Sequence, residues 1–165
     1  MEAHDMTHGA IEPANTLQAE LRAARARAMH KHTRDFAIPG YGGRLWGTFR
    51  ALDDYAEVRK IVLEHRRVPD EAEGEVLIAA DTLVKSCDSV YAVRHGERTD
   101  LGMTLGRQLA EFLGEPVEND RQAIFAIFPD TLTVMSLYGE IDRWIRAVGV
   151  EADEETAGKS QAASV

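Results

Sequence analysis

The sequence has a single cysteine, Cys87, among its 165 residues. One cysteine excludes an intrachain disulfide, so nothing argues for an oxidising compartment. Long apolar runs are also missing, and none approaches the roughly twenty residues that are needed to span a bilayer. The first ten residues, MEAHDMTHGA, lack the apolar segment of a signal peptide. We therefore expect a protein that stays in the cytoplasm where it is made.

Basic residues are outnumbered, with 19 Lys and Arg against 28 Asp and Glu, and the formal net charge is -9. The long-range field of such a chain disfavours nucleic acid and anionic membrane as partners. The charge is unevenly spread. Residues 151–155 hold four acids and no base, whereas residues 21–34 hold no acid and five bases, which are Arg22, Arg25, Arg27, Lys31 and Arg34. Oppositely charged ends favour docking surfaces, and two solvated ends explain the same charges equally well.

Length and composition fit one folded domain with flexible ends. Hydrophobic residues make up 44% of the chain and charged residues 28%, which is typical of a protein with a packed core. We predict a disordered leader over residues 1–14 and a globular domain over 15–149, in which the basic helix 15–32 is loosely attached. The acidic residues 150–165 are predicted to form a disordered tail.

Hydrophobic periodicity predicts an α+β fold that is mainly α-helical, with a helical bundle-like core and two β-hairpins. The first hairpin is expected over residues 34–52, around Pro-Gly-Tyr-Gly-Gly, and the second over 90–101. Helices are expected at about 15–30, 53–66, 70–87, 105–113, 121–128 and 130–148. The second of these helices should face inward with Tyr55, Val58, Ile61 and Val62, the third with Val76, Ala80, Leu83, Val84 and Cys87, and the last with Val134, Tyr138, Ile141, Ile145 and Val148.

The second hairpin contains VYAVRHGERTD, whose Arg-His-Gly-Glu resembles the opening motif of the histidine phosphatases. That resemblance would make His95 the nucleophile and Arg94 a phosphate ligand. The reaction also needs a second histidine or an acid to protonate the leaving group. In those enzymes the second histidine comes much later in the chain, whereas all six histidines here lie at or before His95. The hairpin interpretation makes His95 an exposed turn residue, and we expect no enzyme.

Other signals for catalysis, cofactors or metals are equally weak. His4 with His8, and His30 with His32, are pairs without a third ligand at suitable spacing. The glycines at 40, 42 and 43 precede a strand-like segment, whereas a phosphate-binding loop requires a helix there. Gly-Lys-Ser near the end lacks the first glycine of a P-loop, because Asp153 occupies that position. The sequence therefore predicts no catalytic residue, no cofactor and no metal.

Three stretches taken together resemble the tail assembly chaperones of long-tailed bacteriophages, particularly those of actinobacterial phages and prophages. They are FAIPGYGGRLWGTFRAL, AADTLVKSCDSVYAVRHGERTDLG, and RQAIFAIFPDTLTVMSLYGEIDRWI followed by an acidic tail. The resemblance implies a non-catalytic protein that coats the tape measure protein in the host cytoplasm. It also implies a contact with the tail tube protein during assembly and absence from the finished virion. A small virion structural or head-tail connector protein is the alternative, and a homo-oligomer is compatible with either.

A chaperone of this kind must shield apolar helices reversibly, for which exposed aromatic side chains on a rigid hairpin are suited. The candidates for partner binding are Tyr41 and Trp46 on the first hairpin, and Arg22, Arg25 and Arg27 in the basic helix. A core position for Trp46 explains its place in the strand equally well.

The resemblance also implies a longer product, made when the ribosome slips back one nucleotide near the end of the reading frame. Slippage favours a message of repeated bases, and the heptamer G-GGA-AAG would encode Gly and Lys after an Ala codon. Ala157, Gly158 and Lys159 are therefore the predicted frameshift-site codons. The frameshifted longer form would be a further partner of this chain, joined through the tail.

Overall fold

The computed structural model describes residues 16–25, 32–52 and 55–162. The chain divides into two compact units, Met1–Thr33 and Arg34–Val165. In the first unit, residues 16–25 form a helix whose side chains are all exposed. The predicted leader over 1–14 and the candidate residue Arg27 lie outside the described residues.

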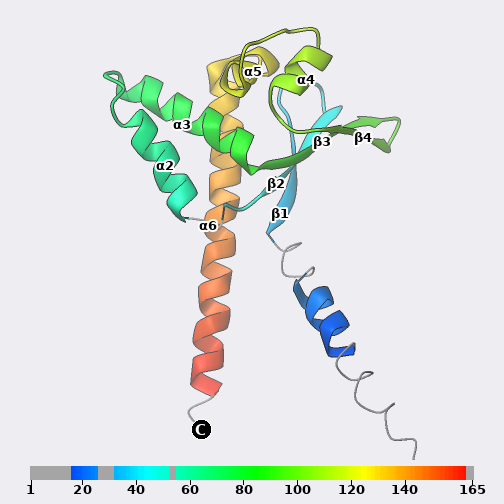
Figure 1. The fold of residues 1–165 in the computed structure, drawn as a ribbon, viewed down its shortest axis with the longest axis vertical. Coiled ribbons are helices and arrows are strands. Elements are labelled where there is room, and N and C mark those ends of the chain that lie inside the picture. The colour runs from blue at the N-terminus through cyan, green and yellow to red at the C-terminus, as the bar shows by residue number, and fades with distance from the viewer. Residues whose placement is uncertain (1–15, 26–31, 53–54, 163–165) are drawn as a thin grey trace, which may run out of the picture. The chain divides into compact units, whose positions relative to one another are not determined.

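The described strands form one four-stranded sheet in the order β1-β2-β3-β4 (Figure 1). The strands are β1 (Thr33–Ala37), β2 (Leu45–Arg50), β3 (Cys87–Arg94) and β4 (Glu97–Met103). Both predicted hairpins are present, and antiparallel pairing of β2 with β3 joins them. The α+β prediction is confirmed, but the sequence did not indicate that the hairpins share a sheet.

Five helices of the second unit begin and end close to the predicted positions, except at the C-terminal end. They are α2 (Tyr55–His65), α3 (Glu71–Ser86), α4 (Arg107–Phe112), α5 (Asp120–Ile127) and α6 (Thr131–Ala162). Side chains of Asp70, Asn119 and Asp130 accept hydrogen bonds from backbone N–H groups in the first turns of α3, α5 and α6. Such N-caps satisfy donors that have no partner within the helix.

The core lies between one face of the sheet and helices α3 to α6. In β2, buried Leu45, Gly47 and Phe49 alternate with three half-buried residues, with the period of two that is typical of a strand. Phe49 is fully buried, and its ring meets Phe36 of β1 edge to face at 5.9 Å between centroids. A sheet packed against helices therefore replaces the predicted bundle-like core.

The predicted inward face of α2 is only partly correct. Ile61 is buried, but Val58 and Val62 remain 38% and 37% exposed. The side chain of Tyr55 lies outside the described residues. Helix α2 packs chiefly on α3. The apolar face of α2 is therefore wider than the surface of α3 that covers it.

The C-terminal end differs from the predicted disordered tail, because α6 continues without a break to Ala162. Residues 150–162 are rich in Ala, Glu, Gln and Lys, which favour helix. Nucleation is the costly step in helix formation, and here the packed first half of α6 supplies the nucleus. The predicted frameshift positions Ala157, Gly158 and Lys159 consequently lie in helical backbone.

The turn between β3 and β4 has the geometry that suits a two-residue hairpin. Arg94 pairs with Glu97, and the two residues between them, His95 and Gly96, have φ of 53° and 81°. Positive φ at both positions is the type I′ turn, which matches the twist of the strands. His95 is exposed, which confirms that the motif resembling a phosphatase forms a hairpin turn.

A type I′ turn prefers asparagine at its first position. We therefore expect His95→Asn to raise the free energy of unfolding by about 0.5 kcal/mol, because asparagine adopts positive φ more readily than histidine does. Urea denaturation followed by circular dichroism measures the difference. A loss of stability on this substitution would show that the His95 side chain makes a contact that the fold requires.

Within the described residues, no single helix is long and apolar enough to cross a membrane. Helices α5 and α6 satisfy length and composition only as a pair, which is bent by 106° between them.

Candidate partner-binding surface

The face of the sheet turned away from the core carries a connected group of polar and aromatic side chains. We call it the outer face and define it by Asp35, Trp46, Thr48, Tyr91 and Arg98. The Asp35 carboxylate accepts hydrogen bonds from the hydroxyls of Thr48 and Tyr91, at 2.6 and 2.9 Å, and lies 3.5 Å from Arg98 Nη1. One carboxylate of β1 thereby ties together side chains from β2, β3 and β4.

Three of these side chains form a stack across the strands. Trp46 is paired with Tyr91 in the β2–β3 register, and their rings are nearly parallel, 6.4 Å apart and 12° from coplanar. The Arg98 guanidinium carbon lies 3.7 Å from the centre of the Tyr91 ring, which is a cation–π contact. Tyr91 is therefore only 6% exposed although it stands on the outer face. This burial, together with the hydrogen bond to Asp35, raises the pKa of the Tyr91 hydroxyl.

Trp46 lies on the outer face and is half-buried, so the core alternative is wrong. Its indole Nε1 donates to the carbonyl of Gly43 at 2.8 Å. This bond and the contact with Tyr91 fix the ring in one position. Trp46 is consequently a rigid aromatic surface, as the partner-binding prediction requires.

The Tyr41 side chain makes a contact within the folded domain. Its hydroxyl donates to the carbonyl of Ile127 at 2.5 Å and thereby fastens the β1–β2 loop to α5. Burial, with a smaller effect from the nearby Glu115 carboxylate, raises the pKa of Tyr41. The adjoining Gly40 has φ of +93°, and a Cβ there would lie 2.5 Å from Pro129 Cγ. Tyr41 thus offers only part of its ring to a partner.

The basic helix of the first unit has an uncovered apolar stripe. Leu17 and Leu21, one turn apart, are 57% and 62% exposed, and Arg22 and Arg25 beside them are exposed as well. Trp46 belongs to the second unit, whereas Arg22 and Arg25 belong to the first.

A partly buried polar network that the sequence did not reveal joins α2, α3 and α5. His65 Nε2 lies 2.6 Å from Asp81 Oδ2, and the His65 side chain is 5% exposed. Arg121 binds both oxygens of Asp81, with Nε to Oδ1 at 2.9 Å and Nη2 to Oδ2 at 2.8 Å. Burial alone would raise the pKa of Asp81, but the hydrogen bonds from Arg121 and His65 outweigh it and lower that pKa.

Glu64, His65 and Asp81 place ligand atoms within 4.8 Å of one another, a spacing that could hold a metal ion. The Arg121 guanidinium occupies both Asp81 oxygens, however, and its Nη2 is 3.4 Å from His65 Nε2. A divalent cation would have to displace that guanidinium from its bidentate contact. The arrangement is better explained as an ion-pair network that holds three helices together. A cavity of 280 Å³ adjoins it, lined in part by Asp81 and Arg121.

Cys87 is buried at the junction of α3 and β3, as predicted from its place on the apolar stripe. Burial raises the pKa of its thiol to about 11. A thiol of that pKa is protonated at neutral pH and is a poor nucleophile. Its sulfur accepts a hydrogen bond from Leu105 N at 3.4 Å, so Cys87 contributes to the packing of the α4 segment on the sheet.

Basic side chains gather at the end of the second hairpin. Arg44, Arg94 and His95 surround a hollow of 590 Å³ whose remaining lining is Ala92 and Val93. We call it the cationic hollow. Among the described residues, its lining includes His95 and two arginines.

No protein-family model matches the chain, and neither a curated protein nor a solved structure is significantly similar to it.

Proposed function

We propose that the protein is a non-catalytic tail assembly chaperone of a long-tailed bacteriophage. It binds the tape measure protein in the host cytoplasm, keeps its apolar helices from aggregating, and assists assembly of the tail tube around it. The proposal rests on the resemblance of three sequence stretches to that family. The structural observation that carries it is the rigid Trp46–Tyr91–Arg98 stack on the outer face of the sheet.

The stack suits reversible binding of an apolar helix for two reasons. Trp46 is held by a hydrogen bond and by the Tyr91 ring. Binding a client therefore costs its side chain little conformational entropy, and such preorganisation favours affinity. Tryptophan, tyrosine and arginine are also the residues that most often dominate binding energy at interfaces. The surface combines an indole face with a cation, which fits a client helix whose apolar residues are flanked by carboxylates.

The helix at residues 16–25 supplies a second apolar strip. Leu17 and Leu21 are exposed there beside Arg22 and Arg25. An amphipathic helix binds another helix through such residues at i and i+4. Because this helix belongs to a separate unit, it can add to client binding without altering the packed domain.

Co-expression with the tape measure protein tests the proposal. We expect the chain to raise the soluble yield of that client severalfold, and Trp46→Ala with Arg98→Ala to remove most of the gain, because both sides of the stack are then lost. Phe112→Ala is the matched control, since Phe112 is a 61% exposed aromatic residue on α4. Equal client yields with and without the chain would contradict the proposal.

Removing residues 1–31 is expected to reduce, but not abolish, the gain in soluble client. The deletion takes away the strip of Leu17 and Leu21 and leaves the sheet and its core complete. Thermal unfolding of the truncated chain should match that of the full chain. If the truncated chain protects the client fully, the basic helix has no part in binding.

The proposal includes a frameshifted longer form as a partner. Codons 157–159 would then contain a slippery heptamer, and an open frame would overlap them in the shifted register. Because these residues continue α6, the extension would be carried on a helix rather than on a flexible tail. The gene sequence decides this prediction, since the absence of either feature leaves this chain as the only product.

A further inference from the structure

The cationic hollow contains basic side chains that the fold leaves without acidic partners. Arg50, Arg98, Arg107, Arg121 and Arg146 each form an ion pair with a carboxylate. In the part of the chain that the structure describes, Arg44 and Arg94 form none.

The backbone holds the cationic hollow in shape. Val93 N donates to the carbonyl of Arg44 at 2.7 Å, so the start of β2 is fixed to the end of β3. Arg94 closes the β3–β4 ladder opposite Glu97, and His95 occupies the turn. Two guanidinium groups and an imidazole thus line a concave surface together with Ala92 and Val93, and such a surface is suited to a carboxylate-bearing segment.

The chain itself contains a segment of matching charge. Residues 151–155, Glu-Ala-Asp-Glu-Glu, hold four acids and no base, and they lie within α6. Positions 151, 154 and 155 are spaced i, i+3 and i+4, which places them on one face of a helix. Three carboxylate positions on one helix face correspond in number to the three basic side chains around the hollow.

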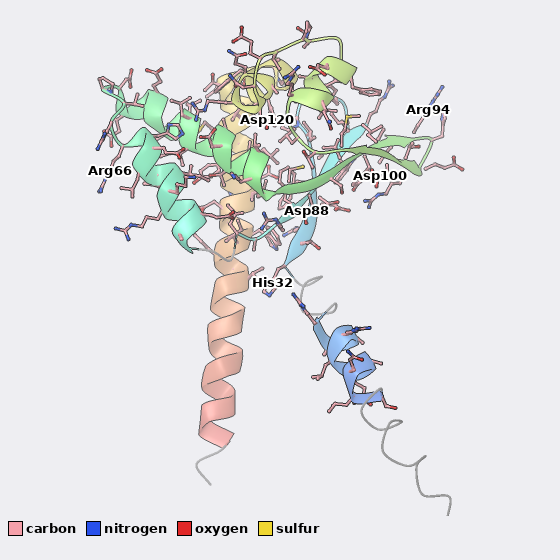
Figure 2. All side chains as sticks on the ribbon, viewed as in Figure 1. His32, Arg66, Asp88, Arg94, Asp100 and Asp120 are labelled. Atoms are coloured by element: carbon pink, nitrogen blue, oxygen red, sulfur yellow. The ribbon has the colours of Figure 1, made fainter. Side chains whose placement is uncertain are left out.

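The hollow of the same copy is out of reach of this segment. The Tyr41 hydroxyl donates a hydrogen bond to the carbonyl of Ile127, which lies shortly before α6. The Tyr41 carbonyl in turn accepts a hydrogen bond from Arg44 N at 3.1 Å. The hollow therefore lies at the end of the sheet where α6 begins. Position 151 follows Thr131 by twenty residues, or about 30 Å along the helix axis. In Figure 2, Arg94 stands at the tip of the β3–β4 hairpin while α6 runs away from it.

We propose that the cationic hollow binds the acidic helix segment 151–155 of a second copy of this chain. Hollow and segment are different surfaces, so the contact is head to tail and leaves one hollow and one segment free for further copies. This self-association does not depend on the proposed chaperone function, because it involves no client.

The net charge of the chain opposes this contact at long range, whereas the opposite charges of the hollow and the segment favour it at short range. At a net charge of -9, two copies repel each other at a distance, so attraction must come from a local patch of opposite sign. Ion pairs at exposed positions are weak and are screened within about 10 Å at 0.1 M salt. The association should accordingly be modest and should weaken as salt is added.

Sedimentation velocity of the full chain over a range of concentrations tests the proposal. At low ionic strength we expect reversible, concentration-dependent growth beyond the monomer, and near 1 M salt, where screening acts within about 3 Å, a return to monomer. Arg44→Glu with Arg94→Glu should lower the association constant at least about tenfold, since attraction becomes repulsion. Arg66→Glu with Arg67→Glu is the control, because it changes the net charge equally at two exposed arginines in the turn after α2.

A charge exchange makes the test specific. Glu151→Lys, Glu154→Lys and Glu155→Lys together should also abolish association. Mixing this variant with the hollow variant should produce a complex, because the segment variant keeps the basic hollow and the hollow variant keeps the acidic segment. Combining both sets of changes in one chain restores opposite charges, so association should return. A wild-type chain that stays monomeric at low salt, or a hollow variant that associates as the wild type does, overturns the proposal. Circular dichroism confirms that each variant is folded.

Discussion

Replacing Phe49 with alanine is expected to lower the free energy of unfolding by about 4 kcal/mol. Phe49 is fully buried on the inner face of the sheet, where its ring contacts Phe36. It also fills the space above Gly47, at which a Cβ would lie 2.6 Å from the Phe49 ring. Removing the ring leaves a cavity that the backbone of β2 cannot close. Urea denaturation of the purified variant measures the loss.

Trp46→Ala is the matched control, because Trp46 stands three residues away on the opposite face of the same strand. We expect it to cost only about 1 kcal/mol, since the indole is half-buried and its loss opens no cavity in the core. The contrast tests the assignment of the two faces. Similar losses for Phe49→Ala and Trp46→Ala would mean that Trp46 supports the core and is a poor candidate for partner binding.

The second large effect is expected at Asp81. Asp81→Asn should lower the free energy of unfolding by about 2 kcal/mol, because it weakens the contacts to Arg121 and to buried His65. This figure is below that of a fully buried ion pair, since Arg121 is 43% exposed and solvent screens part of the interaction. Asp142→Asn is the control, because Asp142 pairs with the 79% exposed Arg146 on one helix face and should change stability by less than about 0.5 kcal/mol.

The Asp81 contribution should depend on pH in a definite direction. The pKa of Asp81 is lower in the folded protein than its ordinary value of 3.8. The stabilisation is therefore fully present above pH 3.8 and is lost as the pH falls through the folded pKa. The stability difference between wild type and Asp81→Asn should hold steady above that value and narrow below it. A difference that instead narrows above pH 5 or so would assign the effect to another group.

Local signals in the sequence predicted most of the elements, because each has a cause within a few residues. Asp70 and Asp130 stand where N-caps are needed, and Gly96 stands where the second hairpin needs positive φ. The pairing of β2 with β3 could not be predicted in this way. Trp46 and Tyr91 meet across the sheet although they are far apart in the sequence, and alternation alone does not reveal the partner of a strand.

The candidate surfaces likewise contain features that local sequence patterns predicted and contacts between distant residues that they did not. The period of two in β2 places Trp46 and Phe49 on opposite faces, but which of the two faces the core depends on the position of the helices. The network of His65, Asp81 and Arg121 was missed because its members come from three helices. The one sequence signal was Asp81 itself, a charged residue between the buried positions Ala80 and Leu83 of α3.

The helical continuation of α6 was missed for a different reason. Low hydrophobicity and high charge indicate that a segment cannot form a core of its own. They do not exclude helix when the preceding turns are anchored, as they are here by Val134, Leu137 and Ile141.

The most direct test of the chaperone proposal uses Trp46 as its own reporter. The chain has two tryptophans, so Trp144→Phe leaves Trp46 as the single indole. Titration with apolar helical segments of the tape measure protein should shift the Trp46 emission to shorter wavelength in a saturable manner, because a client helix removes water from the indole. A Trp46 spectrum that stays unchanged at saturating client would contradict client binding on the outer face of the sheet.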